Sequence, residues 1–507
     1  MSRDLDRLRQ AAKHLRRDFA RGDADASRRV AAILPHATVL RHADALHILA
    51  REAGAESWPK LKFASELASA DRATRAERLK YALYLGQHWR VDALLSADPA
   101  LPDHHMTLAI ALYDVARVRA ALEADPSLAI AAYGPRRPIL HLAFSQYHHH
   151  RPDLRDAMIE IAEMLVAHGA DVNDAYPSEP DGPHMLSALY GALGHANNVP
   201  LARWLLERGA NPDDYESLYH ATELGHHDGL RLLREFNATT AGTNALARML
   251  DFDDLEGARL LLEMGADPNE TVPPHPSGEP VPMIPALHQA ARRGRDGRFA
   301  RLLVEFGARG DQDYNGHGAY ALARIMGNRD FATALEELGL ASPLTPLEQT
   351  LADCADGTLH PSPIPPGTAL TAEAALLPVR LAGDDTRLDH LKALLAAGLP
   401  FTVVDEMELP PLHIALWQGQ VQTVTWLLRQ NPDLTHFNAY GGDALGTLMH
   451  GADNAPKMAQ QDHVACLKLL RAAGVPFRAE EMQGTGSEEM LAALEDWQAS
   501  RAMEGGG

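Results

Sequence analysis

The stretch LLERGANPD at residues 205–213 decides the fold, because close variants of it recur along the chain. Two leucines followed by a glycine and a small residue return in LLEMGADPN at 261–269 and in LLVEFGARGD at 302–311. A second signature built on a Leu-His pair appears in PILHLAF at 138–144, PALHQAARRG at 285–294 and PPLHIALWQG at 410–419. Two motifs that recur together in a fixed order indicate one repeated structural unit.

The paired motifs resemble the ankyrin repeat, in which roughly 33 residues form a β-turn and two antiparallel helices. The resemblance spans residues 76–482 and implies an all-α fold, an ankyrin-repeat solenoid of helix-turn-helix repeats with β-turn loops. The expected divisions are an N-terminal helical cap at 1–72, repeat blocks at 73–342 and 343–482, and a C-terminal helix with a flexible glycine tail at 483–507. The cap carries SWPKLK at 57–62 and is similar to a segment found on many bacterial ankyrin proteins.

Several stretches interrupt the repeat pattern and are expected to be loops. They are residues 147–154, 175–183 and 273–285, together with the proline-rich insertion around 361–366 in the second block. Proline cannot continue a helix, and runs of it suit solvated connections.

Composition excludes several classes of function. The chain has 47 basic and 68 acidic side chains, and its formal net charge of −21 repels nucleic-acid phosphates and anionic lipid surfaces. No apolar run reaches the about 18 residues of a membrane span, and the N-terminus lacks the apolar stretch of a signal peptide. Cys354 and Cys466 have no metal-ligand or disulfide spacing. We therefore expect a soluble, cytoplasmic, monomeric protein of bacterial origin.

Candidate binding residues follow from the helical pattern of the second signature. Its leucine and the small residues three and four positions later share the buried helix face, so the positions between them should line the concave surface. One repeat contributes only Gly191 and Gly194 there, beside acidic, basic and imidazole side chains. The pattern predicts a polar hollow near residues 190–293, with binding residues Tyr190, Tyr219, His220, Glu223, Arg248, Asp251, Gln289, Arg292 and Arg293. The alternative is that these groups neutralise one another as solvated pairs.

Metal binding is a further interpretation of part of this set. His220 and Glu223 are three residues apart on one expected helix, and Asp251 follows in the next repeat. Such donors can ligate a divalent metal, although a helical His/Glu pair more often forms a surface hydrogen bond. The run YHHHRPD at 147–153 is either a metal-binding tract or a loop folded against a neighbour. No strong cofactor-binding motif occurs, so no cofactor is predicted.

Two functions from different classes are compatible with these residues. The resemblance implies a recognition scaffold that binds a protein or peptide in its concave groove, where Arg248, Arg292 and Arg293 could select one carboxylate or phosphate of a partner or small anionic ligand. The alternative is an enzyme or small-molecule sensor with His220 as general base and Glu223 or Asp251 orienting it or binding a metal. In that case the arginines would hold an anionic substrate.

Overall fold

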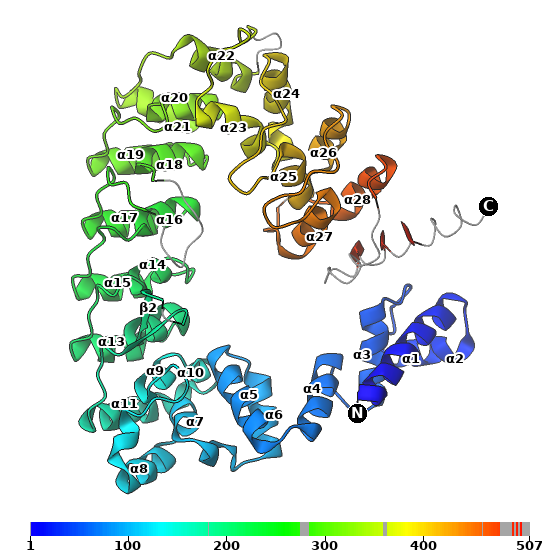
Figure 1. The fold of residues 1–507 in the computed structure, drawn as a ribbon, viewed down its shortest axis with the longest axis vertical. Helices are drawn as coiled ribbons and strands as arrows, with labels where there is room; N and C mark the ends of the chain where they lie inside the picture. Colours follow the sequence, from blue (N-terminus) through cyan, green and yellow to red (C-terminus); the bar gives the residue numbers. More distant parts are fainter. Residues whose placement is uncertain are drawn as a thin grey trace. The chain divides into compact units, whose positions relative to one another are not determined.

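The chain is mostly helical (Figure 1). The computed structural model describes residues 2–180, 182–273, 283–357, 362–458 and 460–476, with short pieces at 489–490, 493–494 and 497–498. Of the helix expected at 483–507 the three short pieces are helical, and the rest of it, the glycine tail and parts of the insertions at 273–285 and 361–366 lie outside these residues. The expected N-terminal cap consists of four helices, which are α1 (Ser2–Ala20), α2 (Ala24–Ile33), α3 (His42–Glu52) and α4 (Trp58–Ser69).

Most of the remaining helices form consecutive pairs. The first members are α5 (Arg72–Tyr84), α7 (Met106–Ala111), α9 (Pro138–Ala143), α12 (Ala188–Tyr190) with the π-helix η4 (Gly191–His195), α14 (Ser217–Ala221), α16 (Ala245–Asp251), α18 (Ala286–Arg292), α20 (Ala319–Ile325), α23 (Ala372–Leu381), α25 (Pro411–Trp417) and α27 (Ala444–Asn454). The second members are α6 (His88–Ala97), α8 (Val115–Ala124), α11 (Arg155–Ala167), α13 (Val199–Glu207), α15 (Asp228–Glu235), α17 (Leu255–Glu263), α19 (Gly297–Glu305), α21 (Arg329–Glu337), α24 (Leu388–Ala396), α26 (Val421–Leu428) and α28 (His463–Ala472).

A few elements stand outside this pairing. The helix α22 (Pro346–Ala355) contacts α20 and α24. The remaining short elements are η1 (Leu101–His104), η2 (Pro126–Ala129), α10 (Tyr147–His150), η3 (Pro152–Leu154), η5 (Asp385–Arg387), β1 (Ala175–Pro177) and β2 (Met185–Ser187).

The chain divides into two compact units. Unit 1 comprises Met1–Leu40, Asp44–Gln289 and Leu302–Ala308, and unit 2 comprises Arg41–Ala43, Ala290–Arg301 and Arg309–Gly507. Within unit 1, the helices α11, α13, α15 and α17 follow one another in one row, and α9, α12, α14 and α16 follow in a second row (Figure 1).

The recurring Leu-Leu-x-x-Gly-Ala motif ends the second helix of a pair. At the end of α13 the N–H of Gly209 donates to the carbonyl of Leu206 at 3.0 Å, and the N–H of Ala210 donates to that of Leu205 at 3.0 Å. These two bonds form a Schellman motif, which needs a left-handed residue after the helix. Gly209 has φ 91°, a conformation that a side chain would strain. Gly265 repeats it after α17 with φ 99°.

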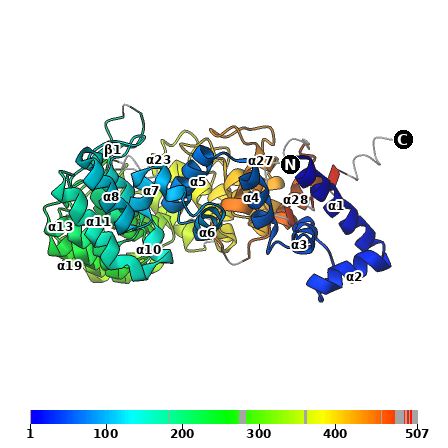
Figure 2. The ribbon, with the colours of Figure 1, turned by 90° about the horizontal axis from the view of Figure 1, so that it is seen from below.

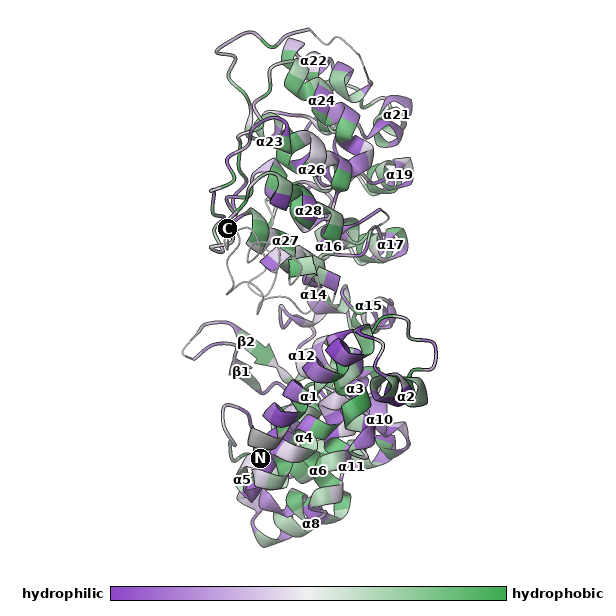
Figure 3. Cartoon of the chain, turned by 90° about the vertical axis from the view of Figure 1, so that its right-hand side faces the viewer, coloured by the Kyte–Doolittle hydropathy of each residue, from purple (hydrophilic) through white to green (hydrophobic). Residues whose placement is uncertain are grey.

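Apolar side chains of the paired helices form the core. In unit 1, Leu205, Leu233 and Leu261 of successive second helices are almost fully buried. Figure 3 shows that many helices carry both apolar and polar residues, which is typical of helices half-covered by neighbours. None of the described helices has the length and apolar character needed to cross a lipid bilayer.

Two of the expected loops contain regular structure. Residues 175–183 were expected to be a loop, but β1 (labelled in Figure 2) pairs with β2 in an antiparallel hairpin, seen in Figure 3, and Tyr176 lies buried with its ring centroid 5.4 Å from that of Phe144. Residues 147–154 form α10 and η3 rather than an irregular connection. Tyr147 of α10 is buried, as Tyr176 of β1 is. In each segment the buried aromatic side chain holds the backbone in a fixed position.

The packing of α27 on α25 in unit 2 predicts unequal effects of adding a methyl group to two glycines of one helix. A Cβ on Gly451 would lie 2.2 Å from the carbonyl oxygen of Trp417, whereas a Cβ on Gly446 has its nearest neighbour at 3.6 Å. We expect Gly451→Ala to lower the free energy of unfolding by about 1–3 kcal/mol, because backbone must shift. Gly446→Ala should be neutral or raise it by up to about 1 kcal/mol through helix propensity.

Urea unfolding of both variants and the wild type measures this difference. Equal midpoints for Gly451→Ala and Gly446→Ala would contradict the close packing of α27 on α25.

Candidate functional site

A fully buried carboxylate, that of Glu216 at the start of α14, is the centre of the candidate site in unit 1. Its Oε1 lies 2.7 Å from Nε2 of His184, and its Oε2 lies 3.1 Å from Nε2 of His220. The other ring nitrogen of His220, Nδ1, lies 2.8 Å from Oε2 of Glu223. His220 therefore bridges two carboxylates, and Glu216 is shared by two imidazole rings.

The bridging position determines the protonation state of His220. Burial disfavours the charged ring, but the hydrogen bonds with Glu216 and Glu223 outweigh it and raise the pKa of His220 to about 9. The hydrogen bond with His220 in turn lowers the pKa of Glu223. At neutral pH the ring is an imidazolium held between two acids.

The contacts continue into the next helices through Arg248 of α16. Its Nη2 donates to Oε1 of Glu223 at 2.9 Å, and its Nη1 lies 3.5 Å from Oδ2 of Asp251. Nε2 of Gln289 in α18 donates to Oδ1 of Asp251 at 2.6 Å. The guanidinium also stacks over the ring of Phe252, 4.6 Å from its centroid.

We call this set the polar row. Its members are His184, Glu216, His220, Glu223, Arg248, Asp251 and Gln289, and it runs from His184, just before β2, through α14 and α16 to α18.

Aromatic rings fill the space beside the two glycines that were expected to leave a hollow. A Cβ on Gly191 would lie 2.5 Å from Cδ2 of Phe144, and one on Gly194 would lie 2.6 Å from Cδ2 of Tyr190 and 2.8 Å from Cβ of His220. The Tyr190 ring lies tilted against that of His220, with 4.9 Å between the centroids. Burial, followed by the charge of Glu216, raises the pKa of Tyr190. The glycines thus permit close packing of rings.

The structure brings together seven of the nine predicted binding residues. Tyr190, Tyr219, His220, Glu223, Arg248, Asp251 and Gln289 all lie in unit 1, where the Tyr219 ring meets that of His220 edge to face at 5.1 Å. Arg292 belongs to unit 2 and lies 4.0 Å from the carboxylate of Glu373. Arg293 is exposed.

Sequence reasoning missed two members of the polar row. Glu216 stands four residues before His220, a helical spacing that could have indicated it. His184 gave no such signal, because it reaches Glu216 from the hairpin that the sequence did not predict.

The arrangement does not favour a metal centre at His220, Glu223 and Asp251. Both ring nitrogens of His220 are bonded to carboxylates, and Asp251 is held by Arg248 and Gln289. A metal ligand needs an unprotonated ring nitrogen. Among the residues that the structure describes, no group of three or more His, Cys, Asp or Glu side chains is placed to hold a metal ion.

The histidines of YHHHRPD fold against neighbouring segments. Nε2 of His149 lies 2.8 Å from the carbonyl oxygen of Ala196, and Nε2 of His150 lies 3.0 Å from Oδ1 of Asp92. Burial lowers the pKa of His148 to about 4. His149 and His150 thus contact different parts of the chain, and the ring of His148 lies against that of His149 at 3.9 Å between centroids.

The two cysteines are buried in unit 2. Burial raises the pKa of the Cys354 thiol to about 11 and that of Cys466 to about 12. The thiolate is the reactive form, so both residues are inert in the folded chain.

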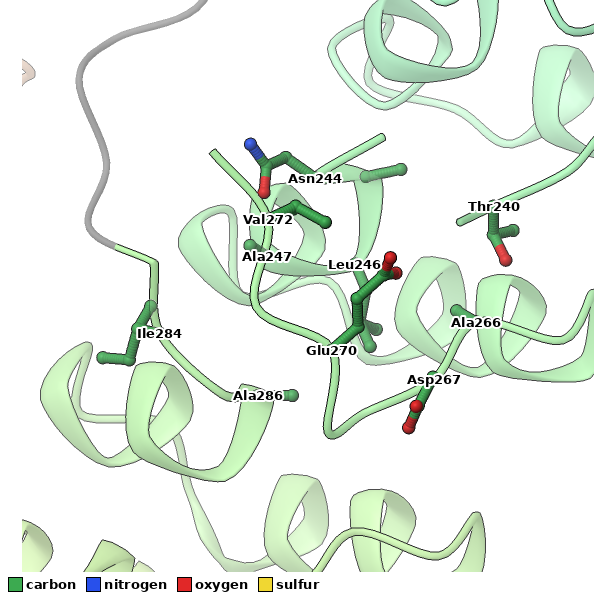
Figure 4. A pocket seen from close by; sticks show the side chains of 11 residues that line it. Thr240, Asn244, Leu246, Ala247, Ala266, Asp267, Glu270, Val272, Ile284 and Ala286 are labelled. Carbon is green, nitrogen blue, oxygen red and sulfur yellow. The ribbon is translucent and has the colours of Figure 1, made fainter. Parts of the chain in front are cut away.

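A small pocket lies at the starts of α16 and α18 in unit 1 (Figure 4). It is lined by Asn244, Glu270 and Ile284 among others, and its cavity volume is about 40 Å³. That volume suits a water molecule or two, since a water takes about 30 Å³ of liquid. It is therefore too small for a ligand.

A scan of the chain against protein-family models finds no match, and a search of curated proteins finds none either.

The raised pKa of His220 predicts how the stability of unit 1 changes with pH. The folded-state pKa of about 9 exceeds the usual 6.5, so the bridge stabilises the fold fully below pH 6.5 and loses this effect as pH rises through 9. We expect His220→Gln to be more destabilising at about pH 6 than at about pH 9.5, by roughly 3 kcal/mol for a shift of this size. Urea unfolding at the two pH values measures the difference.

His168→Gln is the matched control, because His168 is exposed and its Nδ1 contacts only its own helix, at the carbonyl oxygen of Met164. A pH-independent effect of His220→Gln would mean that His220 is neutral in the folded chain.

Proposed function

We propose that this chain is an ankyrin-like recognition scaffold of the bacterial cytoplasm that binds a protein or peptide over the polar row. The resemblance of its two sequence motifs to the ankyrin repeat supports this assignment, and the succession of short and long helices in unit 1 is compatible with it. Function depends on the site rather than on the fold, so the proposal rests mainly on the polar row.

The observation that carries the proposal is the continuity of the row across successive helix pairs. Two of its contacts pass from one first helix to the next: Arg248 of α16 donates to Glu223, which lies just after α14, and Gln289 of α18 donates to Asp251 of α16. A solenoid uses such an extended surface of adjacent repeats to hold an extended partner. The row offers alternating acids and bases at fixed positions.

The charges of the row indicate the chemistry of the partner. Glu223 is the most accessible carboxylate of the row, with a third of its side chain exposed, whereas those of Glu216 and Asp251 are buried. A partner that presents a lysine or arginine would pair with the accessible edge of Glu223, and the net charge of −21 would steer it there.

The alternative of an enzyme that uses His220 as general base is less well supported. A general base must be unprotonated at the working pH, whereas the pKa of His220 is raised to about 9. Both ring nitrogens are also occupied by carboxylates, so neither faces a substrate.

The proposal predicts that a charge-neutral double substitution in the row removes partner binding. Glu223→Ala/Arg248→Ala deletes one acid and one base joined at 2.9 Å, and loss of such a central contact should weaken binding about tenfold or more. Immobilised wild-type and variant chains are compared for the proteins they retain from an extract of the source cells, quantified by mass spectrometry. Retained proteins are then cross-linked to locate their contacts.

Arg231→Ala/Glu256→Ala is the matched control, because this exposed pair joins the second helices α15 and α17 at 2.6 Å. A partner retained by the wild type and the control but lost from the Glu223/Arg248 variant supports the proposal. Equal retention by all three chains would place the binding surface elsewhere.

A further inference from the structure

A buried carboxylate and two arginines form a second charged cluster, which lies wholly within unit 2. Glu373, in the first turn of α23, has 2% of its side chain exposed. Arg380, in the last turn of the same helix, places Nη2 3.1 Å from both of its carboxylate oxygens. Arg292, at the end of α18, places Nε 4.0 Å from Oε2 of Glu373.

Other donors also contact Glu373. Nδ2 of Asn315 donates to its Oε1 at 3.5 Å, and the hydroxyl of Tyr314 is hydrogen-bonded to the carboxylate. Burial, and then the charge of Glu373, raises the pKa of this tyrosine. The hydrogen bonds from Arg380 and Asn315 end on Oε1, whereas Oε2 has no hydrogen-bond partner among the described residues. Arg292 is left at ion-pair distance without a hydrogen bond to it.

The guanidinium of Arg292 is therefore under-satisfied. Only 13% of its side chain is exposed, and its Nε is buried without an acceptor in the part of the chain that the structure describes. Nε of Arg380 is also buried without a hydrogen-bond acceptor among the described residues. A buried charged donor that lacks acceptors costs more than a neutral one, and guanidinium offers five N–H groups.

Arg248 of the polar row is the useful comparison. Its side chain is almost equally covered, with 14% exposed, but it donates to Glu223 at 2.9 Å. Although burial opposes the charge of Arg248, this hydrogen bond leaves its pKa raised. For Arg292, burial and then the charge of Arg380 lower the pKa, because no acceptor compensates. Nε of Arg248 is also buried without an acceptor among the described residues, so the two arginines differ in the hydrogen bond that Arg248 donates through Nη2 to Glu223.

We propose that Arg292 and Arg380 bind an oxyanion, the carboxylate or phosphate group of a ligand, in unit 2. The cluster holds two cations against one carboxylate and has exposed Arg293 next in sequence, so it is locally positive in a chain whose net charge is −21. The planar fork of a guanidinium matches two oxygens of a carboxylate or phosphate. This site is independent of the polar row, which lies in unit 1.

Isothermal titration calorimetry with inorganic phosphate and, separately, acetate tests the proposal on the full chain at low ionic strength. Binding of phosphate but not acetate would indicate a site for a tetrahedral oxyanion. Binding of acetate would indicate a site for a carboxylate. We expect at least one of them to bind the wild type, and Arg292→Gln to weaken that binding about tenfold or more, as loss of a charge-assisted hydrogen bond predicts. Arg292→Lys keeps the charge without the fork and should give an intermediate loss.

Arg329→Gln is the control, because Arg329 is an exposed arginine of unit 2 paired with Asp356 at 2.9 Å. It should bind the anion as the wild type does. Absence of binding by both anions, or equal binding by the wild type and Arg292→Gln, would overturn the proposal.

Stability without ligand gives a second and independent readout. If Arg292 awaits an anion, then Arg292→Gln should unfold at the same urea concentration as the wild type or at a higher one, because an unsatisfied buried charge is removed. If Arg292 instead serves as the structural partner of Glu373, the variant will unfold at lower urea or fail to fold. That result would overturn the proposal.

Discussion

The shortness of the paired helices is the constraint on which the rest of the structure depends. First helices such as α14 and α16 have five and seven residues, and a second helix such as α15 has eight. Isolated helices of this length do not persist in water, so each must be stabilised by the apolar faces of its neighbours. Buried leucines such as Leu230 and Leu261 supply those contacts. This packing fixes the position of each helix relative to the next one. It therefore also fixes the spacing of the polar side chains that the first helices carry.

Much of the helical fold could be predicted, because the signals were local. The Leu-Leu-x-x-Gly-Ala motif corresponds to backbone hydrogen bonds among residues at most five apart, as around Gly209. The hairpin β1–β2 and the helix α10 were missed for the opposite reason. Their positions depend on burial of Tyr176 and Tyr147 against other parts of the chain, which local patterns do not record. The reading of the whole as an ankyrin-type solenoid stays a prediction.

The candidate site divides in the same way. The contact between His220 and Glu223 follows from helical spacing, and the meeting of Glu223 with Arg248 follows from the packing of the consecutive first helices α14 and α16. The environment of Arg292 did not follow, since its carboxylate comes from α23, several helices later in the chain. The sequence pattern predicts similar positions on the concave surface for Arg248 and Arg292. Arg248 hydrogen-bonds the carboxylate of Glu223, whereas Arg292 only comes within ion-pair distance of Glu373.

Burial of both cysteines has a practical consequence for the study of this chain. Cys354 and Cys466 are fully buried and belong to unit 2, so a thiol reagent can modify them only when their surroundings open. The rate of their modification in native buffer therefore measures the opening of unit 2 alone, since unit 1 contains no cysteine. A cysteine introduced at an exposed position would react first, which permits selective attachment of a probe without removal of the two native thiols.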